Sequence, residues 1–161
     1  IPTLTDAHVA FSDFTQDTFQ DLLITGMDSK QNFVAQVWAN KQDFKFELYG
    51  VNISNWQSGI GEWVDLDRDG TYDLIFTGVR KNNQKEVVSY KNENGNFVEI
   101  PTSIPGLSSA GITLLDIDGN AFTDFIISGK DATDQWKTIQ VNNNGAFKFT
   151  YTIIEENFGG N

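Results

Sequence analysis

A loop rich in aspartate occurs three times in this chain of 161 residues, each time in the same setting. The three copies align without gaps over residues 10–26, 62–78 and 113–129, which read AFSDFTQDTFQDLLITG, EWVDLDRDGTYDLIFTG and TLLDIDGNAFTDFIISG. Their first loop aspartates are Asp13, Asp65 and Asp116, which lie 52 and 51 residues apart. A fixed internal period of this size predicts one structural unit that is built repeatedly.

A second motif follows each loop at a nearly constant distance. It begins at Asn40 (NKQDFKF), Asn92 (NENGNF) and Asn142 (NNNGAF), which lie 27, 27 and 26 residues after the first loop aspartate. Two landmarks in a constant register are hard to obtain by chance. The sequence therefore predicts three units, at residues 1–55, 56–105 and 106–161, the last with a C-terminal tail.

Each unit has the pattern of four short strands. In the second unit the strands are predicted at 60–66, 74–77, 86–90 and 97–100, with an Asn94-Gly95 hairpin turn before the last. The corresponding strands of the third unit are predicted at 112–117, 125–128, 136–141 and 147–151. No segment keeps a 3.6-residue period over helical length. The predicted fold class is all-β, with each unit a four-stranded antiparallel blade of a β-propeller.

Three blades are too few to close a ring, which typically needs about 4–8. Each blade must bury its faces against neighbours. We therefore expect the chain to be part of a larger propeller or to associate with other copies or chains, so that further blades are its predicted partners. A stack of three units with capped ends is the alternative arrangement.

The second loop has the oxygen ligands of a Ca²⁺ site. Counted from Asp65 as position one, acidic side chains fall at positions one, three, five and nine: Asp65, Asp67, Asp69 and Asp73. Gly70 at position six permits a sharp turn, and the backbone carbonyl of Thr71 at position seven could complete the shell. Ca²⁺ takes about six to eight oxygens at flexible geometry, which alternate carboxylates in a tight loop can supply.

The other two loops are variants of this set. The third loop offers Asp116, Asp118, Asn120 and Asp124, with the carbonyl of Phe122 at position seven. Its glycine lies at position four, Gly119, so we expect its turn to be shaped differently. The first loop offers Asp13, Thr15, Asp17 and Asp21, with the carbonyl of Phe19, and it has no glycine. Because Thr15 is a poorer ligand than aspartate, we expect a weak site or a plain turn there.

Two other interpretations of the loops are less satisfactory. An EF-hand loop needs a bidentate Glu at position twelve and flanking helices, whereas position twelve here is Ile24, Phe76 and Ile127. Asp, Asn and Gly also favour ordinary turns. That preference accounts for one aspartate in each loop, but not for four like charges within nine residues, which repel one another unless a cation neutralises them.

The stretches DLDRDGTYDLIFTG and DIDGNAFTDFIISG resemble the FG-GAP/VCBS repeats of integrin α-subunit propellers and of many secreted bacterial proteins. The stretch IPGLSSAGITLLDIDGNAFTDFIISG is similar to tandem VCBS repeats of bacterial surface proteins, and the first unit also resembles T-cell immunomodulatory-type ectodomains. The resemblance implies a propeller with structural Ca²⁺ between the first two strands of each blade, an extracellular setting, and a role in adhesion or recognition. The departures are Thr15 and the displaced glycine of the third loop.

Composition excludes several other functions. The net charge of −11 disfavours nucleic acid and anionic membranes as partners, because both bind basic faces. The chain has no Cys and only one histidine, His8, for which a surface or packing role is expected. No phosphate-binding, zinc or dinucleotide motif occurs, and no stretch is apolar enough to span a membrane. We therefore predict that the chain is not an enzyme.

The sequence thus predicts a Ca²⁺-binding extracellular module for recognition or adhesion, with a protein or glycan ligand. One alternative is a carbohydrate-binding propeller, for which Trp56 is the best exposed candidate, since Trp38 and Trp136 lie in predicted strands and are expected in the core. Another is a non-catalytic part of a larger secreted enzyme. A first residue other than Met suggests a piece of a larger, exported protein.

Overall fold

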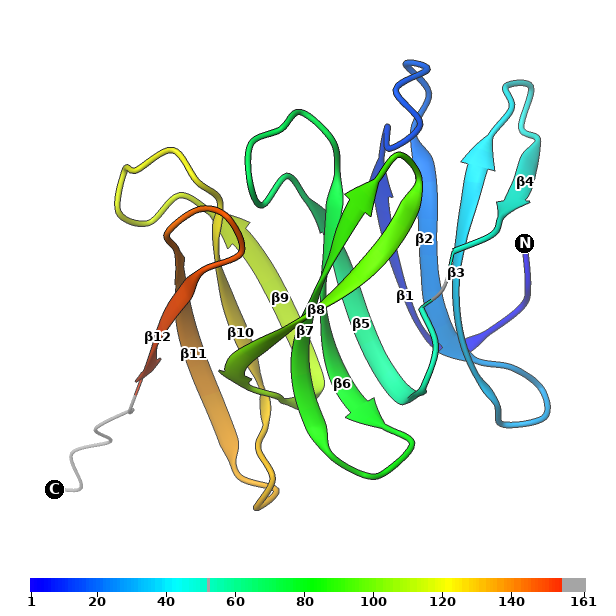
Figure 1. Ribbon diagram of the computed structural model, residues 1–161. Helices are drawn as coiled ribbons and strands as arrows, with labels where there is room; N and C mark the ends of the chain where they lie inside the picture. Colours follow the sequence, from blue (N-terminus) through cyan, green and yellow to red (C-terminus); the bar gives the residue numbers. More distant parts are fainter. Residues whose placement is uncertain (52, 155–161) are drawn as a thin grey trace, which may run out of the picture.

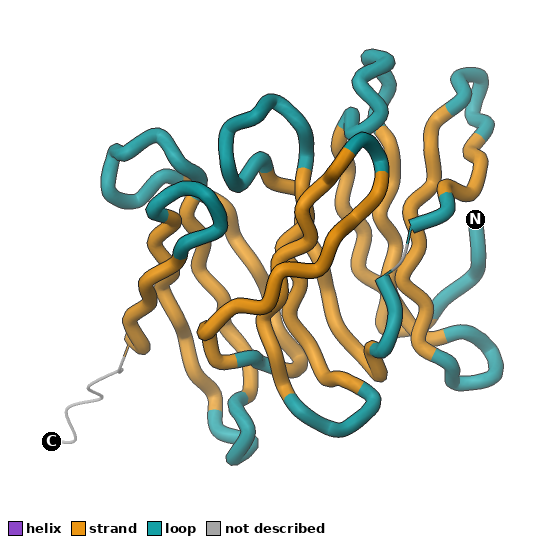
Figure 2. The backbone as a smooth tube through the Cα atoms, viewed as in Figure 1, coloured by secondary structure: helices purple, strands orange, loops and turns teal. Residues whose placement is uncertain are grey.

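The computed structural model describes residues 1–51 and 53–154, and within them it contains twelve antiparallel strands and no helix (Figures 1 and 2). The strands are β1 (Thr5–Ser12), β2 (Asp21–Met27), β3 (Phe33–Asn40), β4 (Phe46–Tyr49), β5 (Trp56–Val64), β6 (Asp73–Arg80), β7 (Lys85–Glu93), β8 (Asn96–Pro105), β9 (Ser108–Leu115), β10 (Asp124–Lys130), β11 (Trp136–Asn143) and β12 (Phe149–Ile154). The predicted all-β class is confirmed. The end of the predicted C-terminal tail, from residue 155 on, lies outside the described residues.

The strands form three four-stranded sheets, each a meander of strands that are consecutive in the chain. We call them the first sheet (β1 to β4), the second sheet (β5 to β8) and the third sheet (β9 to β12). They stand side by side like successive propeller blades, and the three aspartate-rich loops emerge at the same end of the molecule, at the top of Figure 1. No helix in the described part of the chain could cross a membrane.

Most strand bounds differ from the predicted ones by a few residues, and two of these differences have a clear local cause. Strand β5 begins at Trp56, four residues before the predicted start, because Trp56 already pairs with Arg80 of β6 across a β-bulge. Strand β12 begins at Phe149 instead of residue 147. Ala146 and Phe147 have left-handed backbone angles (φ 50° and 58°), so the turn after Asn144 takes two more residues than the Asn-Gly motif predicts.

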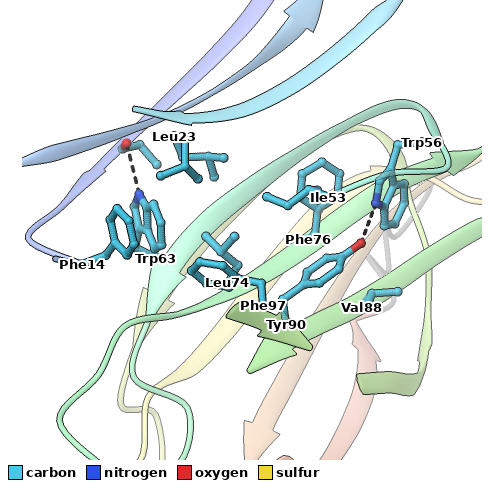
Figure 3. Close-up of a cluster of buried hydrophobic side chains, with 12 residues drawn as sticks. Phe14, Leu23, Ile53, Trp56, Trp63, Leu74, Phe76, Val88, Tyr90 and Phe97 are labelled. Carbon is cyan, nitrogen blue, oxygen red and sulfur yellow. Dashed lines mark hydrogen bonds between the residues drawn. The ribbon is translucent and has the colours of Figure 1, made fainter. Parts of the chain in front are cut away.

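The first and second sheets enclose an aromatic core (Figure 3). The ring of Phe14 stacks on Trp63 at 5.1 Å between centroids and 10° between planes. The indole N–H of Trp63 donates to the carbonyl of Ala10 at 3.3 Å, so that the second sheet is anchored to β1. Phe76 and Leu23 also lie in this core, with no exposed surface.

The second and third sheets enclose a more aliphatic core. Ile75 and Val87 of the second sheet pack with Phe125, Ile127 and Ile139 of the third. Because these strands alternate their side chains between the two faces, the second sheet presents Leu74 and Phe76 to the first sheet and Ile75 to the third. The second sheet is thus buried on both faces, while the two outer sheets are each buried on one.

Two of the tryptophan predictions are wrong. Trp56 is 2% exposed: its indole N–H donates to the hydroxyl of Tyr90 at 2.8 Å, and the Arg80 guanidinium lies 4.0 Å from its ring centroid. Trp136, expected in the core, is 66% exposed: it pairs with Lys130 of β10, but strand alternation places it on the face of β11 opposite to the buried Ile139. The sequence pattern of a strand does not indicate which of its residues a neighbouring sheet buries.

Candidate metal centres

All three aspartate-rich loops share one backbone conformation. Positions four and six are left-handed in every loop, with φ between 59° and 86°. The residues at these positions are Gln16 and Thr18, Arg68 and Gly70, and Gly119 and Ala121. The expectation that the third loop has a different turn is therefore wrong: each of the last two loops places its single glycine at one of the same two positions. The first loop holds the conformation without any glycine, at a cost in strain.

The aspartate at position nine clamps each loop to its sheet. Asp21, Asp73 and Asp124 have no exposed surface, and in each one both carboxylate oxygens accept a backbone N–H. The donors lie at 2.7–3.0 Å and are Thr15 and Asn40 for Asp21, Leu66 and Asn92 for Asp73, and Ile117 and Asn143 for Asp124. A role in backbone anchoring thus accompanies any role in metal binding, and the spacing of acidic residues did not reveal it.

The asparagine that opens the second motif completes this clamp. The side-chain amide of Asn92 donates to the carbonyl of Tyr72 at 3.0 Å, and its side-chain oxygen accepts the N–H of Gly95 at 2.7 Å. Asn143 makes the matching contacts with Thr123 and Gly145. The structural counterpart of Asn40 and Asn92 is therefore Asn143, not Asn142, and with this correction the distance from the first loop aspartate is 27 residues in all three units.

In the second loop, carboxylate oxygens of Asp65, Asp67 and Asp73 lie within 4.8 Å of one another. Oδ2 of Asp65 accepts the N–H of Gly70 at 3.0 Å, but Oδ1 is buried and has no hydrogen-bond partner among the described residues. The pKa of Asp73 is raised to about 6, chiefly by burial and also by the charges of Asp67 and Asp69, against the two backbone hydrogen bonds that lower it. The site thus holds more negative charge than its own donors compensate.

Asp69, the fourth acidic side chain predicted as a ligand in the second loop, lies outside this cluster. Asp69 accepts the hydroxyl of Thr71 at 2.6 Å and its N–H at 2.8 Å, and the hydroxyl bond is the main reason that the pKa of Asp69 is lowered. The Nζ of Lys91 contacts Asp67 and lies 3.2 Å from Asp69. The pKa of Lys91 is raised, chiefly by its hydrogen bond to Asp67. Sequence reasoning missed Lys91, which no loop motif contains.

In the third loop, the corresponding carboxylates of Asp116, Asp118 and Asp124 also lie within 4.8 Å of one another. Asn120 turns its amide toward this cluster and donates to Asp118 at 3.2 Å, while its side-chain oxygen accepts the N–H of Phe122 at 2.7 Å. An oxygen ligand from Asn120 would therefore require its side chain to turn over. As in the second loop, three of the four predicted side-chain ligands converge.

The first loop is closed by its own hydrogen bonds. Asp13 accepts the N–H groups of Asp17 and Thr18, each at 2.9 Å. The hydroxyl of Thr15 donates to Asp21 at 2.9 Å, and Asp17 accepts the N–H of Phe19 at 3.0 Å. Across the described ranges, 1–51 and 53–154, the clusters of three acidic side chains with converging oxygens lie in the second and third loops only. That the first loop is the weakest metal site stays a prediction.

The second and third loops fit a hard divalent cation. Their converging atoms are all carboxylate oxygens, which are the ligands that Ca²⁺ prefers. A buried carboxylate oxygen without a donor, such as Oδ1 of Asp65, is costly unless a cation or proton satisfies it. The clusters also lie at the exposed end of the sheets, where solvent and ions can reach them.

Comparison with known proteins points to the same part of the chain. Residues 65–127 match a family described as FG-GAP-like repeat. The match begins at Asp65, the first residue of the second loop, and ends in β10 beyond the third loop, so both carboxylate clusters fall inside it. No curated protein and no solved structure matches the chain.

Proposed function

We propose that this chain, which carries an FG-GAP-like repeat over residues 65–127, is a Ca²⁺-stabilised module for recognition or adhesion outside the cell. The observation that carries the metal assignment is the buried Oδ1 of Asp65, which has no donor among residues 1–51 and 53–154, in a carboxylate that converges with those of Asp67 and Asp73. The convergence of Asp116, Asp118 and Asp124 supports a second site in the third loop, although there both oxygens of Asp116 accept backbone N–H groups. Asp73 and Asp124 also anchor the backbone of their sheets, so a cation bound there is structural.

The Ca²⁺ assignment predicts that chelation destabilises the protein. A site that is bound only in the folded state stabilises it by about 2.7 kcal/mol when free Ca²⁺ is 100 times the Kd. We expect isothermal titration of the chelator-treated protein to find two sites, and thermal unfolding to move upward with added CaCl₂.

The variants Asp65→Ala and Asp116→Ala should each remove one site, while Asp134→Asn, an exposed acid outside the loops, should remove none. The assignment would be refuted if the unmodified chain bound no Ca²⁺ and its melting temperature were the same with and without EDTA.

The proposed extracellular setting follows from the chemistry of such sites. Oxygen-ligated loops of extracellular modules commonly bind Ca²⁺ with Kd values of about 10⁻⁴–10⁻³ M, which suits a compartment with millimolar Ca²⁺. A Kd of the second or third loop near the submicromolar level, tight enough to fill at cytosolic Ca²⁺, would argue against this setting.

We further propose that a neighbouring blade covers the open face of the first sheet. On this face Val9, Phe11 and Leu48 are 43%, 60% and 56% exposed. Strand registers place Phe11 where Trp63 stands in the second sheet, since Phe11 pairs with Leu22 as Trp63 pairs with Leu74. Trp63 is 5% exposed because the first sheet covers it. The open face of the first sheet is thus apolar, like the faces that meet between the first and second sheets and between the second and third.

An added blade tests this proposal. A copy of residues 56–105 placed before Ile1 would present Val64, Ile75 and Val87, which pack on the third sheet in the chain itself, to the face that carries Phe11. We expect the extended protein to melt at a higher temperature, and the gain to disappear when the added copy carries Ile75→Asp. An extended protein that melts no higher than the original would contradict the proposal.

A further inference from the structure

The side chain of Lys91 brings a fixed positive charge into the second loop. Lys91 lies in β7, directly before Asn92 of the clamp. Its Nζ contacts Oδ2 of Asp67, lies 3.2 Å from Oδ2 of Asp69, and stands 5.3 Å from the ring centroid of Phe147 in the third unit. Carboxylates and an aromatic face thus surround the ammonium group on several sides, which favours the charged form.

The other two units have no charge at this place. The residue before the clamp asparagine is Ala39 in the first unit and Asn142 in the third, whose amide donates to Asp118 at 3.2 Å. Asn142 and Lys91 therefore occupy the same position against the same loop carboxylate, since Asp118 and Asp67 both stand at position three. One supplies a neutral donor and the other a cation.

We propose that Lys91 is a built-in counter-cation of the second loop, which a divalent ion must displace from Asp67 before it can bind. This inference rests on the proposed Ca²⁺ function and concerns the strength of one site. It reverses the ranking that ligand counting suggests: the second loop has four acidic side chains against three in the third, yet the third loop is the tighter site.

The reversal has a simple electrostatic cause. A metal ion at the cluster of Asp65, Asp67 and Asp73 would share the Asp67 carboxylate with the ammonium group of Lys91. The two positive charges, both in contact with one carboxylate, repel each other. Binding must therefore break the Lys91 contacts or tolerate the repulsion. In the third loop, the amide of Asn142 can rotate away at little cost because it carries no net charge.

A reciprocal exchange of the two residues tests the proposal. In the Asp116→Ala background, which leaves the second loop as the only predicted site, we expect Lys91→Asn to tighten Ca²⁺ binding by about two- to fivefold, the scale of a partly exposed ion pair. In the Asp65→Ala background, Asn142→Lys should weaken the third loop by a similar factor. Isothermal titration with CaCl₂ measures both, and circular dichroism checks that each variant is folded.

Three further variants identify the charge as the cause. Lys91→Arg should keep the weak affinity, Lys91→Met should tighten it as Lys91→Asn does, and Lys130→Asn, which removes a lysine from outside the loops, should change nothing. An unchanged Kd on Lys91→Asn, with Ca²⁺ still bound by both loops, would overturn the Lys91 proposal and leave the calcium function intact. No Ca²⁺ binding in any background, Lys91→Asn included, would overturn both.

Discussion

The first and second loops have the same backbone and opposite electrostatics. Both are left-handed at positions four and six, and both are clamped by a buried aspartate at position nine. In the first loop, Thr15 donates its hydroxyl to the clamp aspartate Asp21. In the second loop, Asp67 stands at the position of Thr15 and faces Asp65 and Asp73. At this position the first loop hydrogen-bonds a threonine to the clamp aspartate, whereas the second loop adds a carboxylate to two others.

This difference teaches that the repeated turn and the metal site are separable. The clamp from position nine to two backbone N–H groups holds the turn in every unit and needs no cation. The converging carboxylates are added to that frame in the second and third units. A loop without converging carboxylates, such as the first one, therefore still connects two strands of its sheet.

The largest expected effect comes from removing the aspartate at position nine, which anchors the turn in each loop. Asp21→Ala and Asp73→Ala each leave two backbone N–H groups without their acceptor, and each should lower the free energy of unfolding by about 3 kcal/mol. Chemical denaturation in EDTA, where metal plays no part, measures both. A harmless Asp21→Ala would break the comparison, since it would show that the first loop does not depend on the clamp.

A smaller effect is expected from the ionisation of Asp73. Its folded pKa is raised to about 6 from an unfolded value near 4, so the folded state holds this proton more tightly than the unfolded state does. Without Ca²⁺, the contribution of Asp73 to stability is therefore largest below about pH 4, falls as the pH rises to about 6, and is constant above that. The loss should be on the order of 2 kcal/mol.

Denaturation at a series of pH values in EDTA checks this trend, with Asp73→Asn as the reference that lacks the titrating group. Saturating Ca²⁺ should remove the decline, because a bound cation favours the carboxylate. If the difference in free energy of unfolding between the unmodified protein and Asp73→Asn stays constant between pH 4 and 6, the expectation is contradicted.

The smallest expected effects concern strain in the shared turn. Thr18 and Ala121 both stand at position six with φ of 75° and 69°, where the second loop has Gly70. Thr18→Gly and Ala121→Gly should each stabilise the protein by about 1 kcal/mol, with the larger gain for the β-branched Thr18. Melting curves of the two variants provide the test. A loss of stability in both would show that position six is not strained.

Much of the architecture follows from the sequence alone. The period of the aspartate loops gives the number of units, and alternation with turn motifs gives four strands in each, because apolar side chains must face one side of a half-buried strand. Of the four acidic side chains that the spacing of the second loop predicts as ligands, those of Asp65, Asp67 and Asp73 converge, whereas that of Asp69 does not join them. These features are local in the chain, so the sequence determines them.

The tertiary structure decided everything that depends on which neighbour covers a residue. Trp56 is buried and Trp136 exposed, although both begin strands, because burial depends on packing between sheets. Thr18 and Ala121 hold left-handed angles that their residue types disfavour, because the clamp fixes the turn. Lys91 reaches Asp67 across 24 residues of sequence, and only strand pairing brings them together. The loop motifs are thus local features of the sequence, whereas strand pairing brings the positive charge of Lys91 to the second loop.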